Sequence, residues 1–256
     1  MGAVAVARGV GLSTQVAVLS PALLLVAGWL SRRLIADPPP MPHEHPADAA
    51  DVTGDVPAAA ATTPAGSPPR TTFLNPALLL LGAIAFIGML CEGAATDWSA
   101  VYLRDTLGTS SAVAALAYAV YSGMMVCLRL GSPLLVQRVR TRVLLPVLGL
   151  IATAGMTTAL LSGSVVAGIV GFGTLGLGVA LIVPTCFGVA GRVRGLPTGR
   201  AVAIVSGMGW FGFMGGPPLI GHLAGASTLA VALGVVPALL LFSSVAIRRA
   251  RIFDPV

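Results

Sequence analysis

The sequence contains few charged residues and no lysine. Charged side chains make up 9% of its 256 residues, and the fifteen basic residues are all arginines. Soluble domains carry about 25% charged residues, whereas 56% of this chain is hydrophobic. The composition therefore excludes an ordinary soluble domain and predicts an integral membrane protein. Because the arginines lie in short gaps between apolar runs instead of along one face, we interpret them as topology signals and predict no nucleic-acid partner.

Cysteine and histidine are also scarce. Cys91, Cys127 and Cys186 lie in separate apolar segments without CxxC or Cys/His spacing, so we expect packing roles and neither a disulfide framework nor a metal site. His43 and His45 flank a glutamate in a proline-rich stretch, which favours a solvated loop over a metal site. No nucleotide-binding P-loop or nucleophile elbow occurs in the sequence. These absences predict a protein that is not an enzyme and has no cofactor.

Long apolar runs predict an all-α fold, a polytopic bundle of transmembrane helices. The seven predicted spans are 9–31, the run within 73–105, 111–130, 143–161, 165–190, 201–220 and 228–247. Residues 36–72 are rich in proline, alanine, threonine and acids, which predicts a disordered linker. The predicted organisation is therefore a first helix within 1–35, a linker at 36–72, a six-helix unit at 73–247 and a tail at 248–256.

The arginines predict the orientation of this bundle. With alternating spans, one side of the membrane receives Arg32, Arg33, Arg70, Arg138, Arg140, Arg142, Arg192, Arg194, Arg200, Arg248, Arg249 and Arg251. The other side receives only Arg8 and Arg104. Because arginine is enriched in cytoplasmic loops, we predict an inner-membrane protein with its N-terminus outside and its linker and C-terminus in the cytoplasm.

The segment 73–105, FLNPALLLLGAIAFIGMLCEGAATDWSAVYLRD, contains the leading candidate site residue. Residues 71–91 carry no charge, and a helix of that length spans roughly 30 Å, the thickness of a bilayer core. Glu92 follows about 27 Å along the helix, near the exit side of the core. An acid on a spanning helix indicates function by default. Glu92 is either a proton or substrate contact or a boundary acid held by Thr96 or by water.

Three further polar residues lie close by in the sequence. Asp97 is about 140° around the helix from Glu92, on another face. It is either a second substrate or proton contact or, as its aromatic neighbours favour, a residue of the interfacial belt. Tyr118 and Tyr121 share one helix face. Their hydroxyl groups either line a polar path or pack in the core.

Arg129 lies roughly 28 Å from the start of its predicted helix, near the cytoplasmic boundary. That estimate places it on the opposite side of the membrane from Glu92. We therefore expect Arg129 to snorkel or to cap a neighbouring helix end, and not to pair with Glu92. In the span 165–190, Gly173 and Gly176 are expected to permit close helix approach, and Pro184 is expected to break or bend the helix.

One helix, a long linker and six closely spaced helices resemble the second half of a major facilitator superfamily transporter, preceded by the last helix of the first half. The stretch CEGAATDWSAVYLRDTLG, residues 91–108, is similar to the start of the second half in the sugar-permease-like bacterial branch. Arg129, Gly131 and the run LLVQRVRTRVLL, which holds Gln137 and Arg138, resemble the basic motif of its cytoplasmic loops. GGPPLIG, which holds Gly216 and Pro217, is similar to the Gly-Pro endings of its helices.

The resemblance implies a secondary transporter of a small solute, with or without proton coupling. Members have twelve helices and a cavity between two six-helix halves, so we expect this chain to be incomplete and to need a first half, in frame or as a separate chain. Gln137 stands where the motif usually has an acid, which argues against a charge-pair gate there. The expected partners are the lipid bilayer, a small-molecule substrate and that missing half. The alternative is a half-transporter remnant that does not transport and acts by helix association.

Overall fold

The structure, a computed structural model, describes residues 75–193 and 195–253. Within these residues every regular element is a helix, which confirms the predicted all-α class. The chain separates into two compact units, Met1–Pro69 and Arg70–Val256, and all the described helices belong to the second. The predicted first helix at 9–31, the linker at 36–72 and residues 254–256 of the tail lie outside the described residues.

The described helices follow one another with short connections. They are α3 Pro76–Val101, the π-helix η3 Tyr102–Thr106, α4 Ser111–Arg138, α5 Thr141–Ser162, α6 Val165–Val179, α7 Ile182–Ala190, α8 Thr198–Ala226, α9 Leu229–Leu233, α10 Val235–Arg249 and the 3-10 helix η4 Arg251–Phe253. Five segments are long and apolar enough to cross a membrane: α3 with η3, α4, α5, α6 with α7, and α9 with α10. The sixth predicted span forms α8, whose glycines, prolines and histidine lower its hydropathy.

Local sequence signals set several helix ends. The Asn75 side chain accepts a hydrogen bond from the Ala77 N–H at 3.0 Å, and Pro76 occupies the first position of α3, where no N–H is needed. The Ser110 side chain caps α4 by accepting from the Val113 N–H. Gly163 ends α5 with φ of 59°, a left-handed conformation that glycine adopts without strain.

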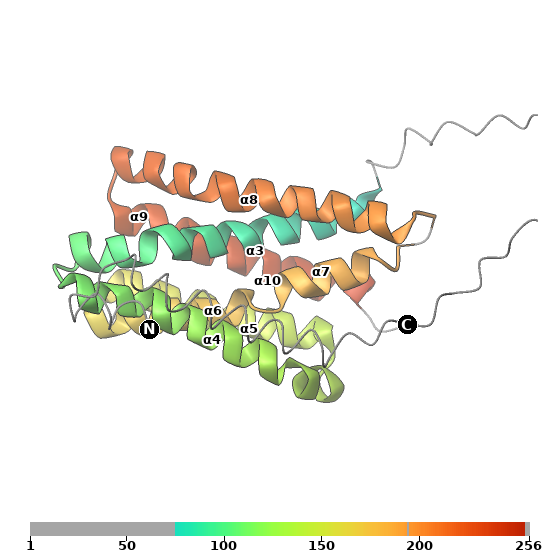
Figure 1. The fold of residues 1–256 in the computed structure, drawn as a ribbon, viewed down its shortest axis with the longest axis horizontal. Coiled ribbons are helices and arrows are strands. Elements are labelled where there is room, and N and C mark those ends of the chain that lie inside the picture. Colours follow the sequence, from blue (N-terminus) through green and yellow to red (C-terminus); the bar gives the residue numbers. More distant parts are fainter. Residues whose placement is uncertain (1–74, 194, 254–256) are drawn as a thin grey trace, which may run out of the picture. The chain divides into compact units, whose positions relative to one another are not determined.

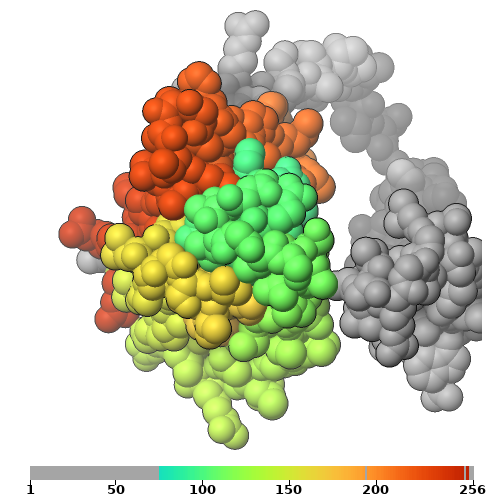
Figure 2. Space-filling view, turned by 90° about the vertical axis from the view of Figure 1, so that its left-hand side faces the viewer, coloured from blue at the N-terminus to red at the C-terminus, as the bar shows by residue number. Residues whose placement is uncertain are grey.

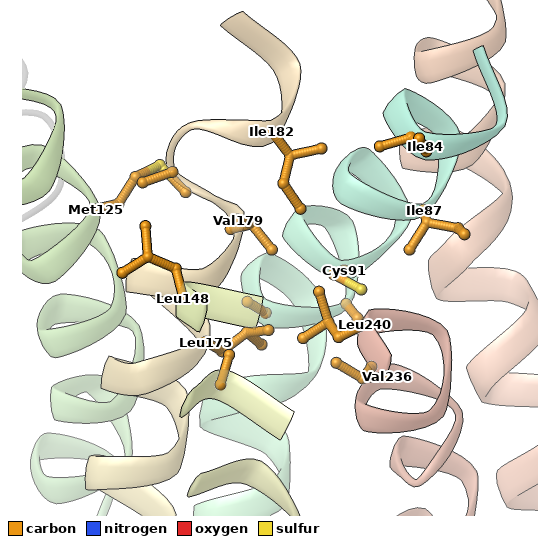
Figure 3. Close-up of a cluster of buried hydrophobic side chains, with 14 of the residues drawn as sticks. Ile84, Ile87, Cys91, Met125, Leu148, Leu175, Val179, Ile182, Val236 and Leu240 are labelled. Carbon is orange, nitrogen blue, oxygen red and sulfur yellow. The ribbon is translucent and has the colours of Figure 1, made fainter. Parts of the chain in front are cut away.

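The helices alternate in direction, so that α3 and α8 run side by side in the same sense while α4 returns beside them (Figure 1). A Cβ atom at Gly212 of α8 would overlap the Phe86 carbonyl of α3, so glycine is required where these helices meet. The core between the helices is apolar. Figure 3 shows side chains that meet there from α3, α4, α5, α6, α7 and α10, including Ile87, Met125, Leu148, Val179 and Leu240.

The structure corrects the predicted elements in three respects. α4 reaches Arg138 and α8 reaches Ala226, because an apolar run marks only the bilayer core, whereas a helix continues into the headgroup layer. Two predicted spans are interrupted, one between α6 and α7 and one between α9 and α10. Cys91 and Cys186 are buried, but Cys127 is exposed on α4, so the packing role expected for Cys127 is wrong.

Candidate functional site

Glu92 lies near the middle of its helix and not near one end. α3 and η3 together form a continuous segment of 31 residues, which is about 45 Å long at 1.5 Å per residue. Glu92 is then about 24 Å from Pro76 and about 21 Å from Thr106. Glu92 is therefore central within its helix, whereas its position near the exit side of the bilayer core stays a prediction from the apolar run.

The side chain of Glu92 is half-buried. The Thr96 hydroxyl donates to the Glu92 backbone carbonyl at 2.9 Å, so its one proton is not available to the carboxylate. No hydrogen bond or ion pair to the Glu92 side chain is found within the part of the chain that the structure describes. Asp97 is exposed one turn further along α3. The two acids thus differ in environment, as the helical angle between them predicts.

Tyr121 has a buried hydroxyl without a hydrogen-bond partner among the described residues. Its side chain is 2% exposed, whereas that of Tyr118 is 41% exposed. The two rings stack with centroids 5.8 Å apart and planes 25° apart. The Tyr121 hydroxyl also lies within electrostatic range of Glu92 and Arg129. The two stacked tyrosines therefore connect the buried Tyr121 hydroxyl, near Glu92, with the exposed ring of Tyr118.

Close packing with α6 positions Tyr121. A Cβ atom at Gly176 would overlap the Tyr121 backbone carbonyl, and one at Gly173 would come 2.8 Å from the Val120 side chain. Glycine at these two positions therefore allows α6 to approach the backbone of α4. Because this contact fixes the α4 backbone at Tyr121, it also fixes the depth of the tyrosine hydroxyl in the bundle.

Arg129 contacts the interruption between α6 and α7. Its Nε donates to the Ala180 carbonyl at 3.0 Å. In an unbroken helix that carbonyl would accept from the N–H of residue 184, but Pro184 has no N–H to donate. The arginine of α4 thus supplies the donor that the proline of α7 removes, and the helix is interrupted at Ala180 and Leu181.

Arg129 and Glu92 lie at comparable depth, contrary to the prediction that they face opposite sides of the membrane. Counted from the end where η3 connects to α4, Arg129 is about 27 Å down its helix and Glu92 about 21 Å. They form no direct ion pair but interact electrostatically. The prediction failed because α3 with η3 continues about 21 Å beyond Glu92, whereas the apolar run placed Glu92 near the end of its span.

The residues assigned to a cytoplasmic loop motif are mostly helical. Gly131, Gln137 and Arg138 lie within α4, and the connection to α5 comprises only Val139 and Arg140. Pro133 cannot donate to the Arg129 carbonyl, but the Ser132 hydroxyl donates to it at 2.7 Å. This replacement allows the helix to continue through the proline.

The structure brings the EGA and GGPP motifs of the sequence together. A Cβ at Gly93 of α3 would lie 2.7 Å from the Phe213 carbonyl of α8, which Pro217 leaves without its usual donor. The Trp98 indole Nε1 donates to the Pro217 carbonyl at 3.3 Å. Gly216 contacts Leu90. These contacts hold the segment that carries Glu92 against the proline-containing part of α8.

The resulting arrangement is one acid, one buried hydroxyl and one arginine within a membrane-embedded bundle. A carboxyl group such as that of Glu92 can bind and release a proton. In the part of the chain that the structure describes, no cluster of three or more histidine, cysteine, aspartate or glutamate residues could hold a metal ion. Sequence reasoning missed the Ala180 carbonyl, although Pro184 four residues later was a signal for it.

Comparisons with known proteins agree with this architecture. The profile described as the Major Facilitator Superfamily matches residues 4–196, more than half of the chain. Membrane protein MosC of Rhizobium meliloti is 35% identical over 159 residues, which cover 62% of this chain and 39% of MosC. An uncharacterized MFS-type transporter of Yersinia pestis is 36% identical over 165 residues, which cover 64% of this chain and 43% of that protein.

A third relative, the uncharacterized transporter y4wD of Sinorhizobium fredii, is 36% identical over 162 residues and is matched over 43% of its length. The chain therefore spans about two fifths of the length of these curated relatives. No solved structure matches it significantly. On the evidence of the profile match and the helical bundle, the chain belongs to the Major Facilitator Superfamily.

Proposed function

We propose that this chain forms part of a secondary transporter that moves a small solute across the inner membrane with protons, and that Glu92 binds the proton. One observation carries the proposal: a half-buried acid lies midway along a spanning helix, with no partner for its carboxylate among the described residues. A charged acid on a spanning helix carries a free-energy cost, so its presence there points to a function. The relatives named as transporters support the same class of activity.

Proton binding at Glu92 has a direct route to the protein conformation. A deprotonated Glu92 attracts Arg129, and Arg129 also donates to the Ala180 carbonyl at the interruption between α6 and α7. Protonation removes the negative charge and leaves the arginine free to hold that carbonyl. The charge on Glu92 thereby changes how firmly Arg129 holds the junction between α6 and α7. Alternating access would follow from movement of this half of the transporter against the other half.

The test is proton movement in membrane vesicles that contain the complete transporter. An entrapped pH-sensitive dye reports proton entry on addition of each member of a panel of small solutes, and counterflow of any active solute is measured without a gradient. In Glu92→Gln the side chain keeps its size and hydrogen-bonding capacity but cannot titrate. We expect solute-driven proton entry to be lost and counterflow to be retained.

Asp97→Asn is the matched control, because it removes an exposed acid from the same helix. It should leave both measurements near the wild-type level at equal protein abundance. Undiminished proton entry in Glu92→Gln would contradict the proposed role of Glu92. Glu92 would then be a boundary acid that water solvates.

The second candidate function is that of a half-transporter remnant that acts through helix association. It rests on the exposed apolar side chains Trp210, Phe211 and Met214 of α8, which a second membrane-embedded helix could cover. Solute exchange by membranes that contain this chain and its missing half would exclude the remnant. A complex with another membrane protein and no exchange under any gradient would favour it.

A further inference from the structure

A second polar feature lies far from Glu92, at the end of the bundle where α4 and α7 finish and α5 begins. A cavity of about 790 Å³ opens there. Its walls come from the start of α3, the last turn of α4, the connection to α5, the end of α7 and η4. The opposite end of the unit, where η3 joins α4 and α8 meets α9, faces the viewer in Figure 2.

Three arginines line this cavity: Arg138, Arg140 and Arg192. Their side chains are exposed, and none takes part in an ion pair or side-chain hydrogen bond among residues 75–193 and 195–253. The acids in those residues are Glu92, Asp97 and Asp105, all on α3 or η3. The cavity therefore concentrates positive charge that no described carboxylate neutralises.

The start of α5 adds to this positive potential. Its cap position is Arg140, with no side-chain cap and no acidic residue in the first turn. The N–H groups of a helix start carry a partial positive charge. The partial positive charge at the start of α5 thus adds to the charge of the three arginines.

The rest of the lining mixes apolar side chains, such as Val139, Val189 and Phe253, with the polar side chains of Asn75, Gln137, Thr141 and Thr185. α4 is about 42 Å long, which exceeds the bilayer core of about 30 Å, so its last turn lies at the level of the lipid headgroups. A ligand that combines a phosphodiester with apolar groups satisfies both kinds of wall. Basic pockets between spanning helices at this level bind anionic headgroups.

We propose that this cavity binds an anionic phospholipid, with Arg138, Arg140 and Arg192 as ligands of its phosphodiester group. The lipid belongs to the leaflet that the arginine distribution predicts to be cytoplasmic. Its binding would join the ends of α4 and α7, and α7 also carries Pro184 at the interruption that Arg129 contacts.

The test measures phosphatidylglycerol binding to the purified full chain in neutral detergent by native mass spectrometry, with phosphatidylcholine and glycerol phosphate as comparison ligands. Each arginine near an anionic lipid contributes about fivefold to affinity. Arg138→Gln combined with Arg192→Gln should weaken phosphatidylglycerol binding about twenty-five-fold. Arg104→Gln removes an arginine charge at the opposite end of the bundle, on η3, and should leave binding unchanged.

Three outcomes would overturn the proposal. Undiminished phosphatidylglycerol binding in the Arg138 and Arg192 double variant would show that the cavity is not the site. Equal affinity for glycerol phosphate would replace the lipid by a soluble anion. Binding that appears only after removal of residues 37–69, which hold five acids, would assign the cavity to that acidic segment.

Discussion

At the scale of single residues, the surroundings of Glu92 and Tyr121 separate alternatives that residue type leaves open. The hydrogen bond from Thr96 goes to the Glu92 backbone, so of the two expected partners of a boundary acid, Thr96 and water, Thr96 does not hold the carboxylate. Tyr121 is buried while Tyr118 is 41% exposed, so two tyrosines that share a helix face have different environments. A buried hydroxyl without a partner reduces stability, which makes Tyr121 a residue whose retention calls for a functional reason.

The first prediction at this scale concerns Tyr121→Phe. Because the hydroxyl has no partner among the described residues, its removal should leave the free energy of unfolding unchanged or raise it by up to about 1 kcal/mol. Transport should nevertheless fall, since the hydroxyl lies near Glu92. Unfolding in mixed detergent micelles and solute-driven proton entry are measured on the same preparation.

Tyr118→Phe is the control for this experiment, because it removes the hydroxyl of the stacked neighbour while keeping the ring. If Tyr121→Phe transported at the wild-type rate, Tyr121 would be a core packing residue and the polar path would be abandoned.

At the scale of elements, prolines and their substitute donors decide how the helices continue. Pro133 lies within α4, which continues because Ser132 donates to the carbonyl that the proline leaves free. Pro184 follows an interruption, and the free carbonyl there receives Arg129 from another helix. A local substitute preserves a helix, whereas a distant one ties two helices together. The junction of α6 and α7 therefore depends on α4.

The prediction for this junction uses a double-mutant cycle. Arg129→Leu leaves the Ala180 carbonyl without its donor and should cost about 1–3 kcal/mol of unfolding free energy. Pro184→Ala restores an N–H that can donate to the same carbonyl. In the double variant the cost of Arg129→Leu should therefore fall by about 1 kcal/mol or more.

Pro217→Ala provides the comparison, because this proline lies in α8 and its carbonyl partner differs. Combined with Arg129→Leu it should give additive effects on unfolding. Additivity for the Arg129 and Pro184 pair as well would mean that the Arg129 contact does not replace the missing helical donor.

At the scale of the whole molecule, the chain belongs to the superfamily, and its relatives are more than twice as long as the matched region. A cavity between halves needs both halves. We therefore propose that the transport activity belongs to the complete assembly, to which this chain would contribute α3, which carries Glu92, and its neighbours α4, α7 and α8.

The prediction at this scale concerns topology. Reporters fused after Val256 or inserted near Thr62 should behave as cytoplasmic, and a reporter inserted near Gly163, between α5 and α6, should behave as external. Alkaline phosphatase and green fluorescent protein fusions report the two sides. A cytoplasmic signal at Gly163 would invalidate the proposed orientation and would move the arginine-lined cavity to the outer leaflet.

The sequence by itself determined the membrane class, the helical fold and the approximate limits of the long described helices. These properties are local, because the length of an apolar run and the residues that cap a helix are determined by amino acids within a few helical turns of one another. The resemblance to the superfamily was also readable from short motifs such as EGA and GGPP. The sequence did not indicate which of these motifs lie next to each other in the fold. Trp98, which follows EGA, and Pro217, which belongs to GGPP, are hydrogen-bonded although they are 119 residues apart.

Only the tertiary structure decided the depth of Glu92 and Arg129 and the contact between Arg129 and Ala180, residues 51 positions apart. Apolar runs measure the bilayer core, whereas depth in the bundle depends on where each helix actually starts and ends. The donor for a carbonyl freed by proline is likewise chosen by whichever helix packs against it. That choice follows from the packing of α4 against α6 through Gly173 and Gly176, which spacing along one helix cannot specify.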